Sequence, residues 1–129
     1  MTNTLHPIIG KRKEVRRATW TQTYLMMAVT TAMRSDDAQT KCGCVITNKE
    51  NTVLSTGFNG IIRGADSSQF PNTRPEKYPF MIHAETNAIL NCSREGHSTK
   101  DGIAYISGRP CIQCYQFMIQ AGISNIHYT

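Results

Sequence analysis

The segment "GIAYISGRPCIQCYQFMIQAGISNIHYT", residues 102–129, decides the fold because a helical pattern stands between two strand-like runs. Residues 102–108 and 124–129 are short and contain β-branched and aromatic side chains, which predicts two strands. Residues 111–122 predict a helix, with Pro110 at its start and Gly122 at its end. A strand, a helix and a second strand in this order predict a crossover between parallel strands of one sheet.

The residues before this segment add two helices, a hairpin and a long loop. Residues 42–48 and 52–58 are β-rich runs joined by a short polar turn, which predicts a hairpin. Residues 59–79 are rich in Gly, Pro, Ser, Asn and Asp and predict a long irregular loop, a feature typical of functional or disordered segments. Residues 84–95 predict a helix. Residues 18–35 predict a first amphipathic helix from apolar side chains at three-to-four spacing, namely Trp20, Tyr24, Met27, Ala28 and Ala32.

The predicted order is therefore α-β-β-α-β-α-β. It indicates a three-layer α-β-α domain over residues 1–129, whose mixed sheet begins with a hairpin and continues with parallel strands. A chain of 129 residues with 40% hydrophobic and 18% charged residues has the length and composition of one globular domain.

The net charge of +5 is concentrated at the N-terminus. Residues 1–17 form a basic arm with five basic residues and one acidic residue, which leaves nine basic and eight acidic residues elsewhere. A nucleic-acid-binding protein would carry a basic stripe on its folded body, so we expect no nucleic-acid partner. The arm is interpreted as a solvated segment or the first turn of a helix, and the alternative is an edge that binds the phosphates of a nucleotide.

The cysteines indicate a reducing compartment. There are five of them, an odd number, and the first 17 residues lack the long apolar core of a secretory signal. We therefore expect free thiols and a cytoplasmic location. No apolar run is long enough to span a bilayer, so we expect no membrane association. Cys42, Cys44 and Cys92 are expected to be small buried hydrophobic residues, with a second metal site as the alternative.

Two motifs predict a catalytic zinc site. His83 precedes one predicted helix, and Cys111 and Cys114 open the next, so all three should meet at the sheet edge where both helices begin. One imidazole and two thiolates with an open fourth position are typical of catalytic zinc. Glu85 is poorly placed to be a fourth ligand but can reach a water that the metal activates. The pattern His-x-Glu followed by Pro-Cys-x-x-Cys is the signature of zinc nucleobase deaminases.

Five segments together resemble a known family. They are "RSDDAQTKCGCVITN", "GFNGIIRGAD", "RPEKYPFMIHAETNAI", "RPCIQC" and "IQAGISNIHY", and they fall in order between residues 20 and 128. The chain resembles the deoxycytidylate (dCMP) deaminases of the cytidine deaminase-like superfamily. This resemblance implies the cytidine deaminase-like fold and the zinc-dependent hydrolytic deamination of dCMP to dUMP and ammonia, which supplies a thymidylate precursor.

The resemblance also implies roles for individual residues. Glu85 would be the general acid and base, and His83, Cys111 and Cys114 would bind Zn²⁺. Asn59 would contact the deoxyribose, and Arg94 would reach a phosphate across a subunit boundary. The remaining predicted substrate-binding residues are Arg34 and Ser35, near the 5′-phosphate, and Ala84.

Regulation is a further implication of the resemblance. Family members are often hexamers that dCTP activates and dTTP inhibits, so we expect a homo-oligomer with these effectors. The predicted effector site, which would hold Mg²⁺ with the triphosphate, comprises Gly57, Phe58, Asn59, Gly60, Arg63 and Asp66. Ile61 and Ile62 depart from the family pattern, which has a proline in this turn.

Two other functions share part of this pattern. A polynucleotide cytosine or adenine deaminase has the same zinc motifs but needs an aromatic and basic channel, and the nearly neutral charge outside the arm disfavours it. Binding that depends strongly on salt would favour it. A non-catalytic, zinc-stabilised nucleotide-binding regulator is the second alternative, and Glu85 disfavours it because a structural site has no use for a carboxylate beside an open position.

Overall fold

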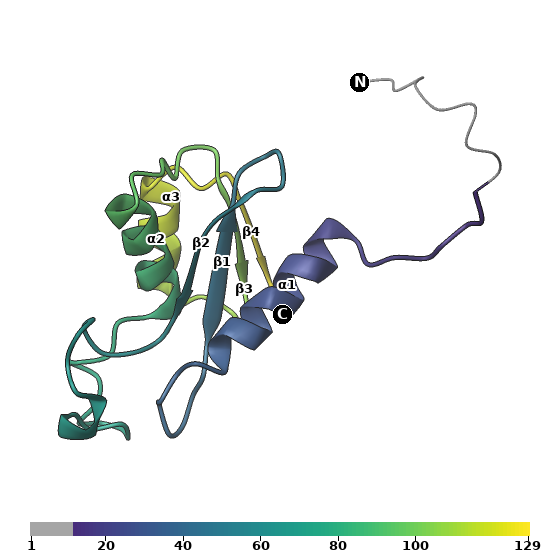
Figure 1. Cartoon of the computed structure of the whole chain (residues 1–129). Coiled ribbons are helices and arrows are strands. Elements are labelled where there is room, and N and C mark those ends of the chain that lie inside the picture. The colour runs from purple at the N-terminus through teal and green to yellow at the C-terminus, as the bar shows by residue number, and fades with distance from the viewer. Residues whose placement is uncertain (1–11) are drawn as a thin grey trace.

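The computed structural model describes residues 12–129 (Figure 1), so residues 1–11 of the predicted basic arm lie outside the described residues. The order of its elements is the predicted one, with a short 3₁₀ helix, η2, added inside the long loop. The elements are α1 (Trp20–Ala32), β1 (Gly43–Thr47), β2 (Val53–Phe58), η2 (Ser67–Gln69), α2 (Ala84–Arg94), β3 (Ile103–Ile106), α3 (Ile112–Gln120) and β4 (Asn125–Tyr128).

The four strands form one mixed sheet in the order β2-β1-β3-β4. Strand β1 pairs antiparallel with both β2 and β3, and β3 pairs parallel with β4. Because β2 and β3 are both antiparallel to β1, they run in the same direction. The connections through α2 and α3 are therefore both parallel crossovers, and the predicted hairpin followed by parallel strands is confirmed.

Helices cover both faces of the sheet, which gives the predicted three layers. Figure 1 shows α1 on one face and α2 with α3 on the other. All five residues of β1 are buried, because this central strand is covered on both sides. On the α1 side Tyr24 and Ala28 pack against Val45 and Tyr105. The predicted helix is confirmed, and Trp20, its first residue, is 60% exposed and stacks on Tyr24.

Two glycines let the helices approach the sheet closely. A Cβ atom on Gly43 would lie 2.0 Å from the carbonyl oxygen of Ala28 in α1. A Cβ atom on Gly57 would lie 2.5 Å from the Ala84 carbonyl oxygen and 2.5 Å from the Ala88 nitrogen, both in α2. The first turn of α2 therefore rests directly on the backbone of β2, and only glycine permits this contact.

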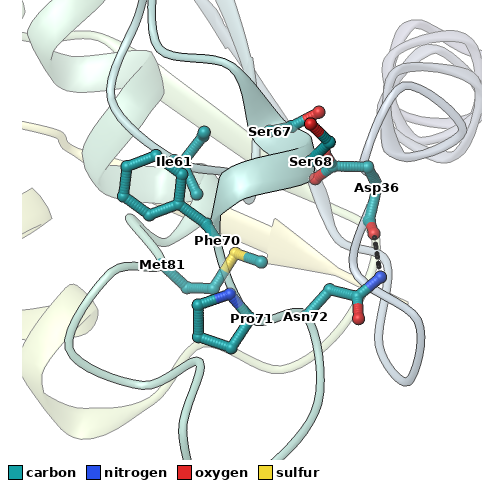
Figure 2. Close-up of a pocket in the computed structure, with 8 residues that line it drawn as sticks. All are labelled: Asp36, Ile61, Ser67, Ser68, Phe70, Pro71, Asn72 and Met81. Atoms are coloured by element: carbon teal, nitrogen blue, oxygen red, sulfur yellow. Dashed lines mark hydrogen bonds between the residues drawn. The ribbon is translucent and has the colours of Figure 1, made fainter.

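The two ends of the long loop between β2 and α2 are joined by an antiparallel bridge between Gly60 and Ile82. Gly60 donates to the Ile82 carbonyl at 3.1 Å, and Ile82 donates back at 2.7 Å. Within the loop, Phe70 and Phe80 pack edge to face. With Asp36 the loop lines a pocket of about 220 Å³ (Figure 2). The segment predicted to be irregular is thus tied at both ends beside α2. In residues 12–129 no helix is both long enough and apolar enough to cross a bilayer.

Candidate metal centre and active site

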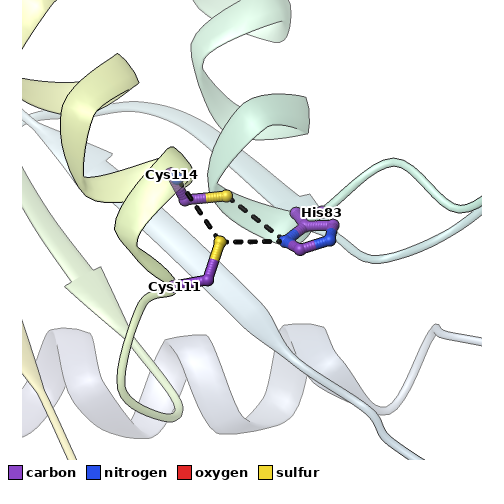
Figure 3. Close-up of side chains that lie close together, drawn as sticks. All are labelled: His83, Cys111 and Cys114. Carbon is purple, nitrogen blue, oxygen red and sulfur yellow. Dashed lines mark hydrogen bonds between the residues drawn. The ribbon is translucent and has the colours of Figure 1, made fainter. Parts of the chain in front are cut away.

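Three predicted metal ligands meet where α2 and α3 begin (Figure 3). His83 is the N-cap of α2, Cys111 is the N-cap of α3, and Cys114 lies in the first turn of α3. The Nδ1 atom of His83 lies 3.6 Å from Cys111 Sγ and 3.3 Å from Cys114 Sγ. The predicted convergence is therefore confirmed, and it follows from the parallel direction of β2 and β3.

These separations fit a zinc ion. Zinc bonds of about 2.3 Å to sulfur and about 2.0–2.1 Å to nitrogen, at tetrahedral angles, place sulfur and nitrogen about 3.6 Å apart. The three ligand atoms all lie within 4.8 Å of one another. Zinc could therefore bind with little movement of the side chains. In the described part of the chain, Cys42, Cys44 and Cys92 form no comparable cluster, and the last two are buried, as expected of small hydrophobic residues.

The start of α3 orients its two cysteines. The Cys114 backbone N–H donates to Cys111 Sγ at 3.4 Å, so the thiol caps the helix in the way that Ser or Asp often does. The helix was predicted to begin at Cys111, but Cys111 is its N-cap and the helix begins at Ile112, so Pro110 directly precedes the cap. The unpaired N–H groups and the dipole of the helix N-terminus favour negative charge on the sulfur atoms.

The surroundings of Cys114 disfavour the thiolate when no cation is bound. Burial raises the pKa of the Cys114 thiol, and the nearby Glu85 carboxylate raises it further, to about 12. The side chain of Thr86, whose Oγ1 lies 3.7 Å from Cys114 Sγ, acts in the opposite direction. A bound metal ion would stabilise the thiolate and so reverse this shift.

Glu85 lies in the first turn of α2 and is 4% exposed. Burial first, and then the Glu85 carboxylate, raise the pKa of Cys42 to about 11. The Glu85 carboxylate oxygens have no hydrogen-bond partner among residues 12–129, and they are not among the fully enclosed unpaired atoms, so they remain open to a bound molecule. A carboxylate without a partner in the fold is available to act on a bound molecule rather than to hold the fold together.

A second buried carboxylate has the opposite character. Asp37 accepts hydrogen bonds from Lys77 Nζ at 2.7 Å and from the N–H groups of Gln39 at 2.8 Å and Thr40 at 3.0 Å. The side chains of Asp37 and Lys77 are only 2% and 4% exposed. Sequence reasoning missed this pair, because the partners are 40 residues apart and no local pattern joins them.

Three of the predicted substrate-binding residues are buried. The Asn59 side chain accepts from the Cys42 N–H at 2.8 Å and donates to the Thr40 carbonyl at 2.9 Å. Ser35 Oγ donates to the Asn59 carbonyl at 2.8 Å. Ala84, at the start of α2, packs against Gly57 through its carbonyl oxygen. The structure therefore places Asn59 and Ser35 in a network that joins the segment before β1 to the end of β2.

The predicted phosphate-binding arginines lie elsewhere. Arg34, Arg63 and Arg94 line one open hollow of about 1000 Å³, called here the arginine hollow, together with Gly57, Phe58 and Gly60. Arg63 also donates to Asn91 Oδ1 of α2 at 2.8 Å. The metal ligands and Glu85 do not line this hollow. The structure thus brings Arg34 and Arg94 together with predicted effector-site residues. Asp66, also predicted there, caps η2 by accepting from the Ser68 N–H at 3.0 Å.

Comparison with known families gives a direct assignment. The model of the cytidine and deoxycytidylate deaminase zinc-binding region matches residues 18–129. The chain belongs to this family. It is 34% identical over 113 residues to the deoxycytidylate deaminase of Pongo abelii, covering 83% of this chain and 62% of the relative. It is 30% identical over 125 residues to the deoxycytidylate deaminase of Mycobacterium phage D29, covering 87% of this chain and 95% of that relative.

The chain spans about three-fifths of the length of the primate relatives. Solved structures share its fold. The dCMP deaminase of cyanophage S-TIM5 superposes with a TM-score of 0.72 at 24% identity, covering 84% of this chain and 80% of that one. A cytidine deaminase from Mycobacterium tuberculosis superposes with a TM-score of 0.57 at 14% identity, covering 88% and 86%. The predicted cytidine deaminase-like fold is confirmed.

Proposed function

We propose that this family member is a zinc-dependent hydrolase that converts dCMP and water to dUMP and ammonia, and so supplies a thymidylate precursor. The observation that carries the proposal is the cluster of His83, Cys111 and Cys114, together with Glu85 in the first turn of the helix that His83 caps. Glu85 is 4% exposed and has no hydrogen-bond partner among residues 12–129. The deoxycytidylate deaminases among its relatives support dCMP as the substrate.

In this mechanism His83, Cys111 and Cys114 hold the zinc ion. When bound, zinc supplies a Lewis acid that makes water a nucleophile near neutral pH. Glu85 takes a proton from the water molecule as this water attacks C4 of the pyrimidine. Glu85 then gives the proton to N3. It then assists proton transfer to the amine, which leaves as ammonia. Its burial keeps bulk water from competing for these protons.

A substrate panel tests the proposal. Zinc-loaded protein should be assayed with dCMP, dCTP, deoxycytidine and cytidine by ultraviolet absorbance, with ammonia measured in the same samples. We expect dCMP to be the preferred substrate and ammonia to appear in a one-to-one ratio with product. If deoxycytidine reacts as well as dCMP, the protein is a nucleoside deaminase, and absence of turnover with all four compounds contradicts the proposal.

We also propose that the arginine hollow binds the triphosphate of dCTP or dTTP. Three arginines supply positive charge there, and the hollow adjoins the pocket of Figure 2, with which it shares Asp36, Ile61 and Ser67. The apolar side chains of Phe70 and Met81 in that pocket suit a nucleobase. The Asp66 carboxylate already caps η2, so the predicted Mg²⁺ would depend on the phosphates and on water.

Assembly and location complete the proposal. Arg94 lines the arginine hollow, and the metal ligands of the same chain do not. In a homo-oligomer, Arg94 of one copy would instead reach the phosphate of a nucleotide bound to the next copy. A hexamer is the form that the resemblance implies. All five cysteines are free thiols, which suits the predicted cytoplasmic location. Light scattering with and without dTTP would measure the oligomeric state.

A further inference from the structure

The buried ion pair between Asp37 and Lys77 joins two segments that border the site. Asp37 lies between α1 and β1, and Lys77 lies in the loop between β2 and α2. Two further contacts hold these segments together: the Ala38 N–H donates to the Asn72 carbonyl at 3.2 Å, and the Arg74 N–H donates to Gln39 Oε1 at 2.6 Å. The ion pair is therefore the buried centre of an otherwise polar and exposed junction.

Asp37 also sets the surroundings of the Asn59 amide. Its Oδ1 atom accepts from the N–H groups of Gln39 and Thr40, which forms the turn that contains the Thr40 carbonyl. Asn59 Nδ2 donates to that carbonyl at 2.9 Å and to Asp37 Oδ2 at 3.4 Å. Both amide donors of Asn59 are thus engaged on the side of Asp37.

The amide oxygen of Asn59 has capacity left. Its Oδ1 atom accepts from the Cys42 N–H at 2.8 Å. A carbonyl oxygen has two lone pairs, and within residues 12–129 only this one donor reaches Oδ1. In this orientation Asn59 can accept a hydrogen bond from a ligand but cannot donate one. In dCMP, the deoxyribose has one free hydroxyl group, at the 3′ position, and this group can donate.

We infer that Asp37 and Lys77 are a positioning pair that holds the Asn59 amide with its oxygen as the acceptor for the 3′-hydroxyl of the nucleotide. This inference rests on the proposed function, because it assigns a determinant of specificity to the same substrate. Lys77 keeps the loop docked and neutralises Asp37, while Asp37 keeps the amide from rotating by half a turn. A rotated amide would turn its oxygen toward the Thr40 carbonyl and the Asp37 carboxylate, which are both acceptors, and would remove that oxygen as the acceptor for the 3′-hydroxyl.

The physical chemistry of the pair supports positioning over stabilisation. Burial alone would raise the pKa of Asp37, but the Lys77 ammonium and the N–H groups of Thr40 and Gln39 hold this pKa below its usual value. The carboxylate is therefore ionised near neutral pH. Replacing a buried ion pair by apolar residues of similar volume is often neutral or stabilising, so the pair is weak evidence for stabilisation and is consistent with a positioning role.

The experiment compares dCMP with 2′,3′-dideoxycytidine monophosphate, which lacks the 3′-hydroxyl. The variants are Lys77→Met, Asp37→Asn and the double variant, which leaves no unpaired buried charge and so covers the case in which a single variant does not fold. Lys41→Met is the matched control, because Lys41 Nζ donates to the Ser35 carbonyl of the same segment without contacting Asp37. Zinc content is measured for every protein.

We expect wild-type protein and Lys41→Met to prefer dCMP by about 10-fold in kcat/KM, the value of one lost hydrogen bond whose partner stays buried. The double variant should lose most of this preference through KM for dCMP, with unchanged zinc content and little change for the dideoxy compound. A double variant that folds, retains zinc and keeps the 10-fold preference would overturn the inference.

Hydrogen exchange of the nucleotide-free protein gives a readout independent of turnover. The Cys42 and Thr40 amides, which donate to Asn59 and Asp37, should exchange at least about 10-fold faster in the double variant than in Lys41→Met. Equal exchange rates would overturn the inference even if wild-type protein does not deaminate dCMP. A wild-type protein that does not deaminate dCMP would overturn the proposed function alone.

Discussion

The contact between Gly57 and α2 gives a prediction whose size follows from the structure. In Gly57→Ala the new Cβ atom would lie 2.5 Å from two backbone atoms of α2, against 3.4 Å for an ordinary contact, so the helix must withdraw by about 0.9 Å. Its first turn carries Glu85, and its N-cap is His83, whereas the two cysteines stay on α3. We expect unfolding free energy to fall by about 1–3 kcal/mol and kcat to fall about 100-fold.

Gly43→Ala is the matched control for this prediction. Its Cβ atom would lie 2.0 Å from the Ala28 carbonyl, an even closer contact, but α1 carries no metal ligand. Urea unfolding should show at least as large a loss of stability, with kcat within about threefold of wild type. The absorption spectrum of Co²⁺-substituted protein should change in Gly57→Ala only. If both variants lose kcat equally, or if Gly57→Ala keeps wild-type kcat, the reasoning about α2 is refuted.

Three further changes test separate parts of the site. Cys111→Ser should lower bound zinc to well below one ion per chain and abolish activity, and metal analysis showing full occupancy would refute the ligand assignment. Arg94→Ala should reduce the preference for dCMP over deoxycytidine by about 10-fold or more, because Arg94 would hold the phosphate of a substrate bound to another copy, and kinetics that leave this preference unchanged would remove it from the substrate site. Arg63→Ala should weaken dTTP binding, measured by calorimetry, while uninhibited turnover stays within about twofold, and dTTP that simply competes with dCMP would contradict a separate effector site.

The sequence predicted the features that depend on local pattern and chain direction. The order of helices and strands followed from the periodicity of the apolar residues and from Gly and Pro residues at the ends of the elements. The meeting of His83 with Cys111 and Cys114 could be predicted, because helices that follow strands of the same direction begin at one edge of the sheet. The boundary of α3 was predicted one residue too early, since a cysteine can cap a helix as a hydroxyl does.

Features that depend on contacts between distant side chains were not predictable. Nothing near Asp37 or Lys77 in the sequence indicates that either charge is buried. Trp20 fits the helical period of α1 but lies at its first residue, where the sheet no longer covers the helix. The arginine hollow brings together side chains from the segment after α1, the long loop and the end of α2, so its composition requires the three-dimensional fold.

The most direct test of the central claim compares wild-type protein with Glu85→Gln, measuring zinc and dCMP turnover in the same samples. Glutamine keeps the shape of the side chain but cannot take up the proton. We expect one zinc per chain in both proteins, wild-type release of ammonia from dCMP, and a loss of kcat of about 10²–10⁴-fold or more in the variant. A Glu85→Gln protein with full zinc and near wild-type turnover, or wild-type protein with full zinc and no turnover of dCMP, would contradict the account.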